Sequence, residues 1–302
     1  MRAMFLHVIC AVLSMAAAPV LGQPASVAHV ETRGAGPVPM VLVPGLSCDW
    51  TVWSDFMDRH GERYTMRAVT LPGFGGSEPP PGAADAPGSP WLDHAVEAVV
   101  RLIRETEGEP PIVVGHSMGA VIAYRLALEH PELIRGAVGV DGPPAIPLGQ
   151  QSLTEAERRR IVDDVIAPAL RAQPASAWAE QQAAQLRAMV RDQDRAGELI
   201  EMAKTTPAAV AVRYALELYR EDLRNELADV TRPVLAIAAL HDDARATGVD
   251  ADTMRAVWEA QVGPLEGVEL VTILDARHFV MDDQPELFDA AVESFVEEVT
   301  AP

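Results

Sequence analysis

Short apolar runs alternate with longer stretches of helical periodicity along most of the chain. Each run is rich in Val, Ile or Leu and is apolar almost throughout, as strands that are covered on both faces are. Strands that alternate with helices form a mostly parallel, doubly wound sheet with helices on both faces. The pattern therefore predicts an α/β fold, with strands at residues 40–43, 65–70, 112–114, 136–140, 234–238 and 268–274.

The strand pattern is interrupted over residues 150–225. This segment is rich in Ala, Glu, Gln and Arg, and its apolar residues recur at helical spacing. Thr154 and Glu157 fit a capping box at the start of its first helix. We expect this segment to form a helical cap inserted after the sixth strand, within a single domain over residues 26–302.

The composition and the net charge indicate which kinds of molecule the protein can bind. The chain has 302 residues, 49% hydrophobic and 23% charged, which is typical of a globular protein with a large core. Its 44 acidic and 24 basic residues give a net charge of −20, and the acidic residues are spread over the whole sequence. A surface of this sign repels nucleic-acid phosphates and anionic lipids. We expect a small-molecule substrate and no nucleic acid.

The first residues resemble a secretory signal peptide over residues 1–25. Arg2 precedes an apolar stretch over residues 4–18, and small residues follow it. A membrane anchor is the alternative, but a span needs about 20 apolar residues. We expect cleavage and export to the periplasm or the medium, with no stable membrane association afterwards. Cleavage removes Cys10 and leaves Cys48 as the only cysteine, so no internal disulfide forms.

A glycine-flanked serine follows the apolar run at residues 112–114. Gly115-His116-Ser117-Met118-Gly119 has the form G-x-S-x-G and stands between a strand pattern and an amphipathic helix. Such a turn is too tight for side chains at the two glycines, and it exposes the serine Oγ. We predict that Ser117 is a nucleophile; the alternative is an ordinary turn residue.

An earlier turn supplies a candidate oxyanion site. The run at residues 40–43 ends in Pro44-Gly45-Leu46, where the architecture with a G-x-S-x-G turn places one half of its oxyanion hole. The backbone N–H groups of Leu46 and Met118 are the predicted donors. A plain strand-ending turn is the alternative for Gly45-Leu46.

With these motifs the chain resembles the α/β-hydrolase superfamily, in the group of esterases, lactonases and prolyl iminopeptidases. The matching stretches occur in the family's order at residues 41–46, 71–77, 115–119 and 277–279. Pro44 departs from the family, which usually has His before the oxyanion-hole glycine. The resemblance implies a sheet of the α/β-hydrolase type and acyl transfer through Ser117 without a metal or an organic cofactor.

The general base must lie downstream of Ser117, because this fold has the chain order nucleophile, acid, base. Three histidines follow Ser117. His130 ends the helix after the nucleophile, and His241 precedes the last strand pattern. His278 follows the strand at 268–274 and is the predicted base; a structural histidine is the alternative.

Several aspartates at strand ends are candidates for the triad acid. The resemblance favours Asp242, although the glycine that usually precedes the acid is missing here. Asp141, which serves in a minority of relatives, and Asp243 are alternatives. Asp275 is read as a turn residue. Asp242 and Asp243 beside His241 also suggest a metal site, but no further ligand spacing accompanies them, so we expect a solvated loop and no metal.

The cap is expected to select a small to medium, partly apolar acyl or alcohol group. Trp50, Phe74 and His116 are the candidate substrate-binding residues, with core packing as the alternative for the aromatic residues.

Two other functions fit the same sequence. An aminopeptidase of the prolyl iminopeptidase type needs acidic residues in the cap, which Glu155, Glu157, Glu180 and Glu221 would supply. A non-catalytic binding protein of the same fold is the second alternative, but it has no need of Ser117 and His278.

Overall fold

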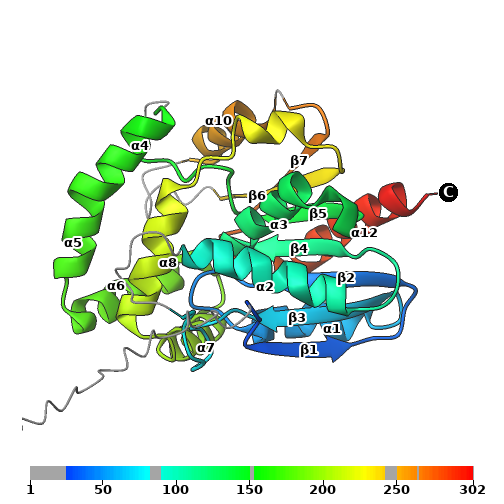
Figure 1. The fold of residues 1–302 in the computed structure, drawn as a ribbon, viewed down its shortest axis with the longest axis horizontal. Helices are drawn as coiled ribbons and strands as arrows, with labels where there is room; N and C mark the ends of the chain where they lie inside the picture. The colour runs from blue at the N-terminus through cyan, green and yellow to red at the C-terminus, as the bar shows by residue number, and fades with distance from the viewer. Residues whose placement is uncertain (1–24, 82–89, 150–152, 242–249, 264, 302) are drawn as a thin grey trace, which may run out of the picture.

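A central β-sheet organises the molecule (Figure 1). The computed structural model describes residues 25–81, 90–149, 153–241, 250–263 and 265–301. Within these ranges seven strands form one sheet in the order β1-β3-β2-β4-β5-β6-β7. β1 is antiparallel to β3, and all other neighbours are parallel. The strands span His29–Arg33 (β1), Val38–Val43 (β2), Tyr64–Thr70 (β3), Ile112–His116 (β4), Gly136–Val140 (β5), Val234–Leu240 (β6) and Val268–Leu274 (β7).

All six predicted strands are present, so the prediction of a mostly parallel sheet is confirmed. β2 and β3 begin one or two residues earlier than predicted, and β4 and β6 end two residues later. β1 is an additional strand. It lies at one edge of the sheet with its residues half-buried or exposed, and its sequence His-Val-Glu-Thr-Arg has only one aliphatic residue, so it lacks the apolar run by which the other strands were predicted.

Helices cover both faces of the sheet, as the doubly wound prediction requires (Figure 1). α1 and α12 pack on one face, where Leu42 of β2 joins their hydrophobic cluster; α2 and α3 pack on the other with Val43. The helices outside the cap span Ser54–His60 (α1), Trp91–Glu105 (α2), Met118–Glu129 (α3), Ala251–Val262 (α10), Val280–Asp283 (α11) and Pro285–Thr300 (α12), with short 3-10 helices at Trp50–Trp53, Pro131–Leu133 and Glu226–Asp229.

The predicted leader, residues 1–25, lies outside the described residues apart from Ala25. Among the described helices, none combines the length and the apolar character that a membrane span requires.

The segment predicted as a cap is helical and lies at one end of the strands (Figure 1). It follows β5, the fifth strand of the described residues, rather than the sixth, because only one edge strand precedes β2 there. The predicted capping box is present: Thr154 Oγ1 accepts the Glu157 N–H at 3.3 Å, and Glu157 accepts the Thr154 N–H at 2.9 Å. The helices span Glu155–Ile161 (α4), Ala167–Ala172 (α5), Ala175–Met189 (α6), Gln193–Ala203 (α7) and Ala208–Arg220 (α8), with a π-helical turn at Val162–Ile166.

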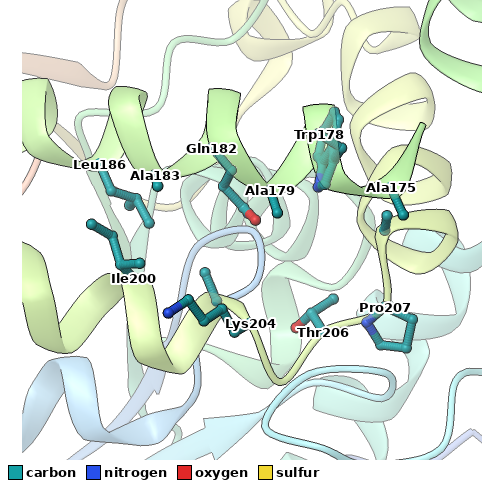
Figure 2. A pocket seen from close by; sticks show the side chains of 12 residues that line it. Ala175, Trp178, Ala179, Gln182, Ala183, Leu186, Ile200, Lys204, Thr206 and Pro207 are labelled. Carbon is teal, nitrogen blue, oxygen red and sulfur yellow. The ribbon is translucent and has the colours of Figure 1, made fainter. Parts of the chain in front are cut away.

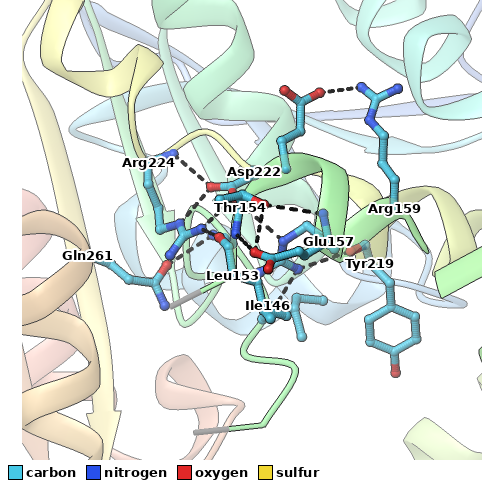
Figure 3. A network of polar contacts seen from close by, with 12 residues as sticks. Ile146, Leu153, Thr154, Glu157, Arg159, Tyr219, Asp222, Arg224 and Gln261 are labelled. Atoms are coloured by element: carbon cyan, nitrogen blue, oxygen red, sulfur yellow. Dashed lines mark hydrogen bonds and ion pairs between the residues drawn. The ribbon is translucent and has the colours of Figure 1, made fainter. Parts of the chain in front are cut away.

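A buried ionic network fastens the first cap helix to the segment that returns to the sheet (Figure 3). Arg158 of α4 lies with its Nε 3.6 Å from Asp222, and both side chains are at least 95% buried. Arg158 also donates to the carbonyl oxygens of Ile146 and Tyr219, at 2.8 and 3.0 Å. Arg224 donates to the same Asp222 carboxylate at 2.7 Å. The two ends of the cap are therefore tied to each other.

Candidate active site

Ser117 stands at the carboxyl end of β4, in a strained turn that leads directly into α3. Its backbone has φ 56° and ψ −117°, outside the regions that non-glycine residues usually adopt. A Cβ on Gly115 would lie 1.9 Å from the Gly119 carbonyl oxygen, and one on Gly119 would lie 2.3 Å from that of Val43. Both glycines of G-x-S-x-G are thus required by close backbone approach, as predicted.

The turn after β2 lies against Ser117. A Cβ on Gly45 would be 3.0 Å from the Ser117 Cβ, so the two backbones are in close contact. Leu46 follows Gly45 directly, and Met118 is the first residue of α3, whose first-turn N–H groups have no partner within the helix. The structure therefore places the turn that precedes Leu46 against Ser117, and Met118 directly after it, while the role of the two N–H groups as oxyanion donors stays a prediction.

His278 follows β7 and is held by Asp141. Its Nδ1 lies 2.7 Å from Asp141 Oδ2. The other carboxylate oxygen of Asp141 accepts the Ala239 N–H at 3.0 Å, and the Asp141 N–H donates to the Ile237 carbonyl at 2.8 Å. Asp141 is thus fixed to β6 by two bonds. A carboxylate on Nδ1 selects the tautomer in which Nε2 is free to accept a proton.

The structure therefore places Asp141, the alternative acid, against His278, the predicted base, whereas the sequence favoured Asp242. Asp242 and Asp243 lie outside the described residues. β5 and β6 are parallel neighbours, so their carboxyl ends meet at the same edge of the sheet, and chain order alone does not distinguish an aspartate on one from an aspartate on the other. Asp275 is an exposed turn residue at φ 55°, as predicted.

The other two downstream histidines do not share the contact with Asp141. His130 caps the end of α3, with its ring nitrogens 3.9 and 4.0 Å from Glu97 and Glu132. His241 follows β6, with its Nδ1 buried and unpaired among the described residues.

His116 packs on the base. Its ring centroid lies 4.5 Å from that of His278, and its Nε2 lies 2.9 Å from the His278 carbonyl oxygen. Only 1% of the residue is exposed, and this burial, with the nearby His278, lowers the pKa of His116 well below 6.5. The neutral ring donates from Nε2 to the carbonyl. His116, predicted to bind substrate, therefore lies where it supports the base.

Phe74 and Trp50, the two aromatic candidates for substrate contact, both pack against other side chains of the protein. Phe74 is fully buried, with its ring centroid 5.0 Å from that of Tyr214. Trp50 is partly buried on the edge of the sheet, beside His29 and beneath the guanidinium of Arg33. Phe74 is thus a core residue, and Trp50 packs on β1.

A second carboxylate fastens the loop that carries the base to the cap, which sequence reasoning missed. Asp283 accepts the backbone N–H of Arg277 and that of Arg191, both at 2.8 Å. The Phe279 N–H donates to the Met189 carbonyl at 3.1 Å. The loop around His278 is therefore bonded to the connection between α6 and α7.

Neither Cys48 nor the potential metal ligands among the described residues form a second reactive centre. Cys48 is 5% exposed, and burial raises the pKa of its thiol to about 12, so it is a poor nucleophile. Within the described ranges, no three His, Cys, Asp or Glu side chains gather closely enough to hold a metal.

The acidic residues proposed for an aminopeptidase are dispersed. Glu155 pairs with Arg159, Glu157 caps α4, and Glu221 lies 3.8 Å from Arg125. Glu180 is exposed on α6.

Comparison with known proteins places the chain in a family. The model of the alpha/beta hydrolase family matches residues 40–291. The chain is 27% identical over 275 residues to a 2-(acetamidomethylene)succinate hydrolase of Mesorhizobium japonicum, covering 89% of this chain and 91% of the relative. It is 34% identical over 116 residues, 38% of this chain and 41% of the relative, to a pimeloyl-[acyl-carrier protein] methyl ester esterase of Aeromonas hydrophila.

Solved structures agree on the fold. An enol-lactonase from Burkholderia xenovorans superposes with a TM-score of 0.67 at 18% identity, covering 91% of this chain and 99% of that one. A hydrolase from Pseudomonas aeruginosa superposes with the same TM-score at 21% identity, over 88% and 93% of the two chains. Together with the match to the family model, these similarities show that the chain is a hydrolytic enzyme and belongs to the alpha/beta hydrolase family.

Proposed function

We propose that the protein hydrolyses an ester, or a related acyl compound such as a lactone or amide, through an acyl-enzyme on Ser117. The observation that carries this proposal is the 2.7 Å contact between His278 Nδ1 and Asp141, at the edge of the sheet where the strained Ser117 also stands. The proposed nucleophile, base and acid thus lie after the carboxyl ends of β4, β7 and β5, respectively.

The proposed reaction has two halves. His278 Nε2 takes the Ser117 proton as Oγ attacks the acyl carbon, and the Leu46 and Met118 amides stabilise the oxyanion. His278 then gives this proton to the leaving alcohol or amine, and the acyl group remains on Ser117. Water, deprotonated by His278, then attacks the acyl carbon, the bond from this carbon to Ser117 Oγ breaks, and His278 returns the proton to Ser117 as the acid is released. Asp141 holds the imidazole and stabilises its charged form throughout.

The proposed substrate is small to medium in size and partly apolar. The names of the two relatives support an acyl compound, because one hydrolyses an acetamidomethylene succinate and the other a methyl ester. The dispersed acidic residues of the cap give no support to the aminopeptidase alternative, which needs a carboxylate cluster for the substrate ammonium group.

The test measures the release of nitrophenol from p-nitrophenyl esters whose acyl chains have two to eight carbons. The purified parent protein is compared with Ser117→Ala. We expect turnover by the parent and its loss in the variant. A fluorophosphonate should also add a single mass increment to the parent and none to Ser117→Ala in intact-protein mass spectrometry. An unlabelled parent without turnover, or equal turnover by both proteins, contradicts the proposal.

We also propose that the protein is exported after cleavage near residue 25. Fractionation of cells that express the full sequence, with the N-terminus of the product determined by mass spectrometry, tests this. A product that keeps residues 1–25 in the cytoplasm contradicts it.

A further inference from the structure

His116 is the last residue of β4, and its buried ring contacts both the turn after β2 and the loop after β7. A Cβ on Gly45 would lie 3.2 Å from His116 Nδ1, so the ring packs against the turn after β2. The ring centroids of His278 and Phe279 lie 4.5 and 4.6 Å from that of His116. A single side chain, one residue before Ser117, therefore lies between this turn and the loop that carries the proposed base.

The His116 ring is bonded to the backbone of the base. Its Nε2 lies 2.9 Å from the His278 carbonyl oxygen. A carbonyl oxygen only accepts, so the neutral ring carries its proton on Nε2. Nδ1 is then an unprotonated acceptor, which is buried and has no partner among the described residues. Burying such an acceptor is costly, and an apolar side chain of similar size would avoid this cost. Packing alone therefore does not explain a histidine here, whereas a donor for the His278 carbonyl does.

This bond joins the loop of the base to the turn of the nucleophile. The N–H of the next residue, Phe279, donates to the Met189 carbonyl at 3.1 Å, so that part of the loop is held by the cap. The His278 carbonyl, by contrast, is held by the residue beside Ser117. A displacement of about 1 Å at a reacting group can lower a rate about 100-fold. The contact made by His116 therefore bears directly on proton transfer between Ser117 and His278.

We propose that His116 is a positioning residue that fixes the base relative to the nucleophile through the His278 carbonyl. The inference rests on the proposed function, because this spacing affects the rate only if Ser117 gives its proton to His278. His116 is 1% exposed and acts through the backbone of the base, so it does not contact substrate.

Two substitutions separate the hydrogen bond from packing. His116→Met fills a similar volume without a donor, whereas His116→Gln keeps an N–H donor at about the same reach. We expect kcat for a p-nitrophenyl ester to fall about 30-fold in His116→Met, because the base is no longer held in place. His116→Gln should recover kcat to within about threefold of the parent, and KM should change by less than about twofold in both variants. His130→Met removes a histidine from the far end of α3 and should keep the parental kcat.

The same substitutions are compared in Ser117→Ala, where the result does not depend on turnover. Nuclear magnetic resonance of protein with ring-labelled histidine reports which nitrogen of His278 carries the proton, and the signal is assigned by its absence from His278→Gln. We expect the Nδ1–H tautomer in Ser117→Ala and also when His116→Gln is added, because Asp141 selects it. Adding His116→Met instead should give a mixture of the two tautomers.

Absence of turnover by the parent would reject the proposed function alone, and the tautomer of His278 would then decide the role of His116. Parental kcat in His116→Met, equal losses of kcat in His116→Met and His116→Gln, or an unchanged His278 tautomer in the presence of His116→Met would overturn the proposal. Circular dichroism of each variant verifies that the fold is kept.

Discussion

Asp141 occupies a backbone conformation that few residues tolerate, and its carboxylate serves two partners. Its φ is 44°, a region in which Asp and Asn are the most common non-glycine residues. One carboxylate oxygen is bound to the Ala239 N–H and the other to His278. An aspartate at the end of β5 therefore satisfies two requirements: it tolerates the backbone angle, and it supplies the carboxylate that contacts His278.

Asp141→Asn should preserve the fold and abolish most of the activity. Asparagine tolerates the same backbone angle, but its amide does not stabilise the imidazolium and favours the wrong tautomer, so kcat should fall about 10³- to 10⁴-fold. Steady-state kinetics on a p-nitrophenyl ester, with circular dichroism to check folding, measure this. Asp242→Asn is the matched control, and we expect it to retain parental kcat; the reverse result would make Asp242 the acid.

His116 makes stability depend on pH. Its pKa is lowered by burial in the folded protein, so the unfolded chain takes up a proton at pH values below about 6.5 that the folded protein does not. This contribution is complete above about pH 6.5 and decreases as the pH falls below it, by up to about 1.4 kcal/mol per pH unit.

The free energy of unfolding in urea, measured at pH 7.5 and 5.5, tests this assignment. His116→Gln should reduce the loss between the two pH values by about 1 kcal/mol relative to the parent. His29→Gln, whose side chain is 52% exposed, should leave the loss unchanged. An identical pH dependence in the parent and His116→Gln would show that His116 is protonated as readily in the folded protein as in the unfolded one.

At the scale of elements, apolar runs predicted six of the seven strands, and a capping box located the start of α4. The pattern did not reveal β1, because its sequence His-Val-Glu-Thr-Arg contains only one aliphatic residue, whereas β7, at the other edge of the sheet, has Val, Leu and Ile at five of its seven positions. Nor did it reveal the role of Asp283, whose carboxylate accepts a backbone N–H from a residue 92 positions away in the chain. Backbone groups carry no sequence signal. The roles proposed for Ser117 and His278 could be assigned from the sequence because each residue follows a strand pattern in a fixed order.

Asp283 bonds the loop that carries His278 to the cap. We therefore expect the position of this loop, and with it the activity, to depend on the Asp283 carboxylate. Asp283→Asn keeps the size of the side chain but replaces one acceptor oxygen by an NH2 group that faces a backbone N–H. We expect kcat to fall about 10-fold, since breaking one of two backbone bonds at about 1–1.5 kcal/mol loosens the loop. KM should change less, because the loop that moves carries the proposed base and not a residue placed in contact with substrate.

Glu298→Gln on α12 removes an equal charge from an exposed position and serves as the control. Parental kcat in Asp283→Asn would mean that the loop keeps its position without the carboxylate.

At the scale of the whole molecule, a buried carboxylate ties the two ends of the cap to each other. Asp222 is 5% exposed between two arginines. Although burial opposes its ionisation, the hydrogen bonds and charge of Arg224 and the charge of Arg158 lower the pKa of Asp222. This carboxylate therefore stabilises the fold at neutral pH, and its contribution is lost only as the pH falls below about 4.

Asp222→Asn should lower the free energy of unfolding by about 3 kcal/mol at pH 7, because it leaves the Arg158 charge buried without its counterion. Urea denaturation measures the loss. Asp163→Asn removes the exposed partner of Arg220 and should cost no more than about 1 kcal/mol. Similar losses in the two variants would indicate that water reaches the Arg158 network.

The position of the single lysine has a practical consequence for chemical labelling. Lys204 carries the only side-chain amine, its side chain is 57% exposed, and it lines a cavity of about 220 Å³ in the cap, between α6 and the connection from α7 to α8 (Figure 2). Apart from the terminal amine, a dye, crosslinker or biosensor surface that reacts with amines therefore attaches every molecule at this one point. Proteins immobilised in this way share one orientation with this cavity close to the support, so coupling through carboxylates is the better choice for screening ligands.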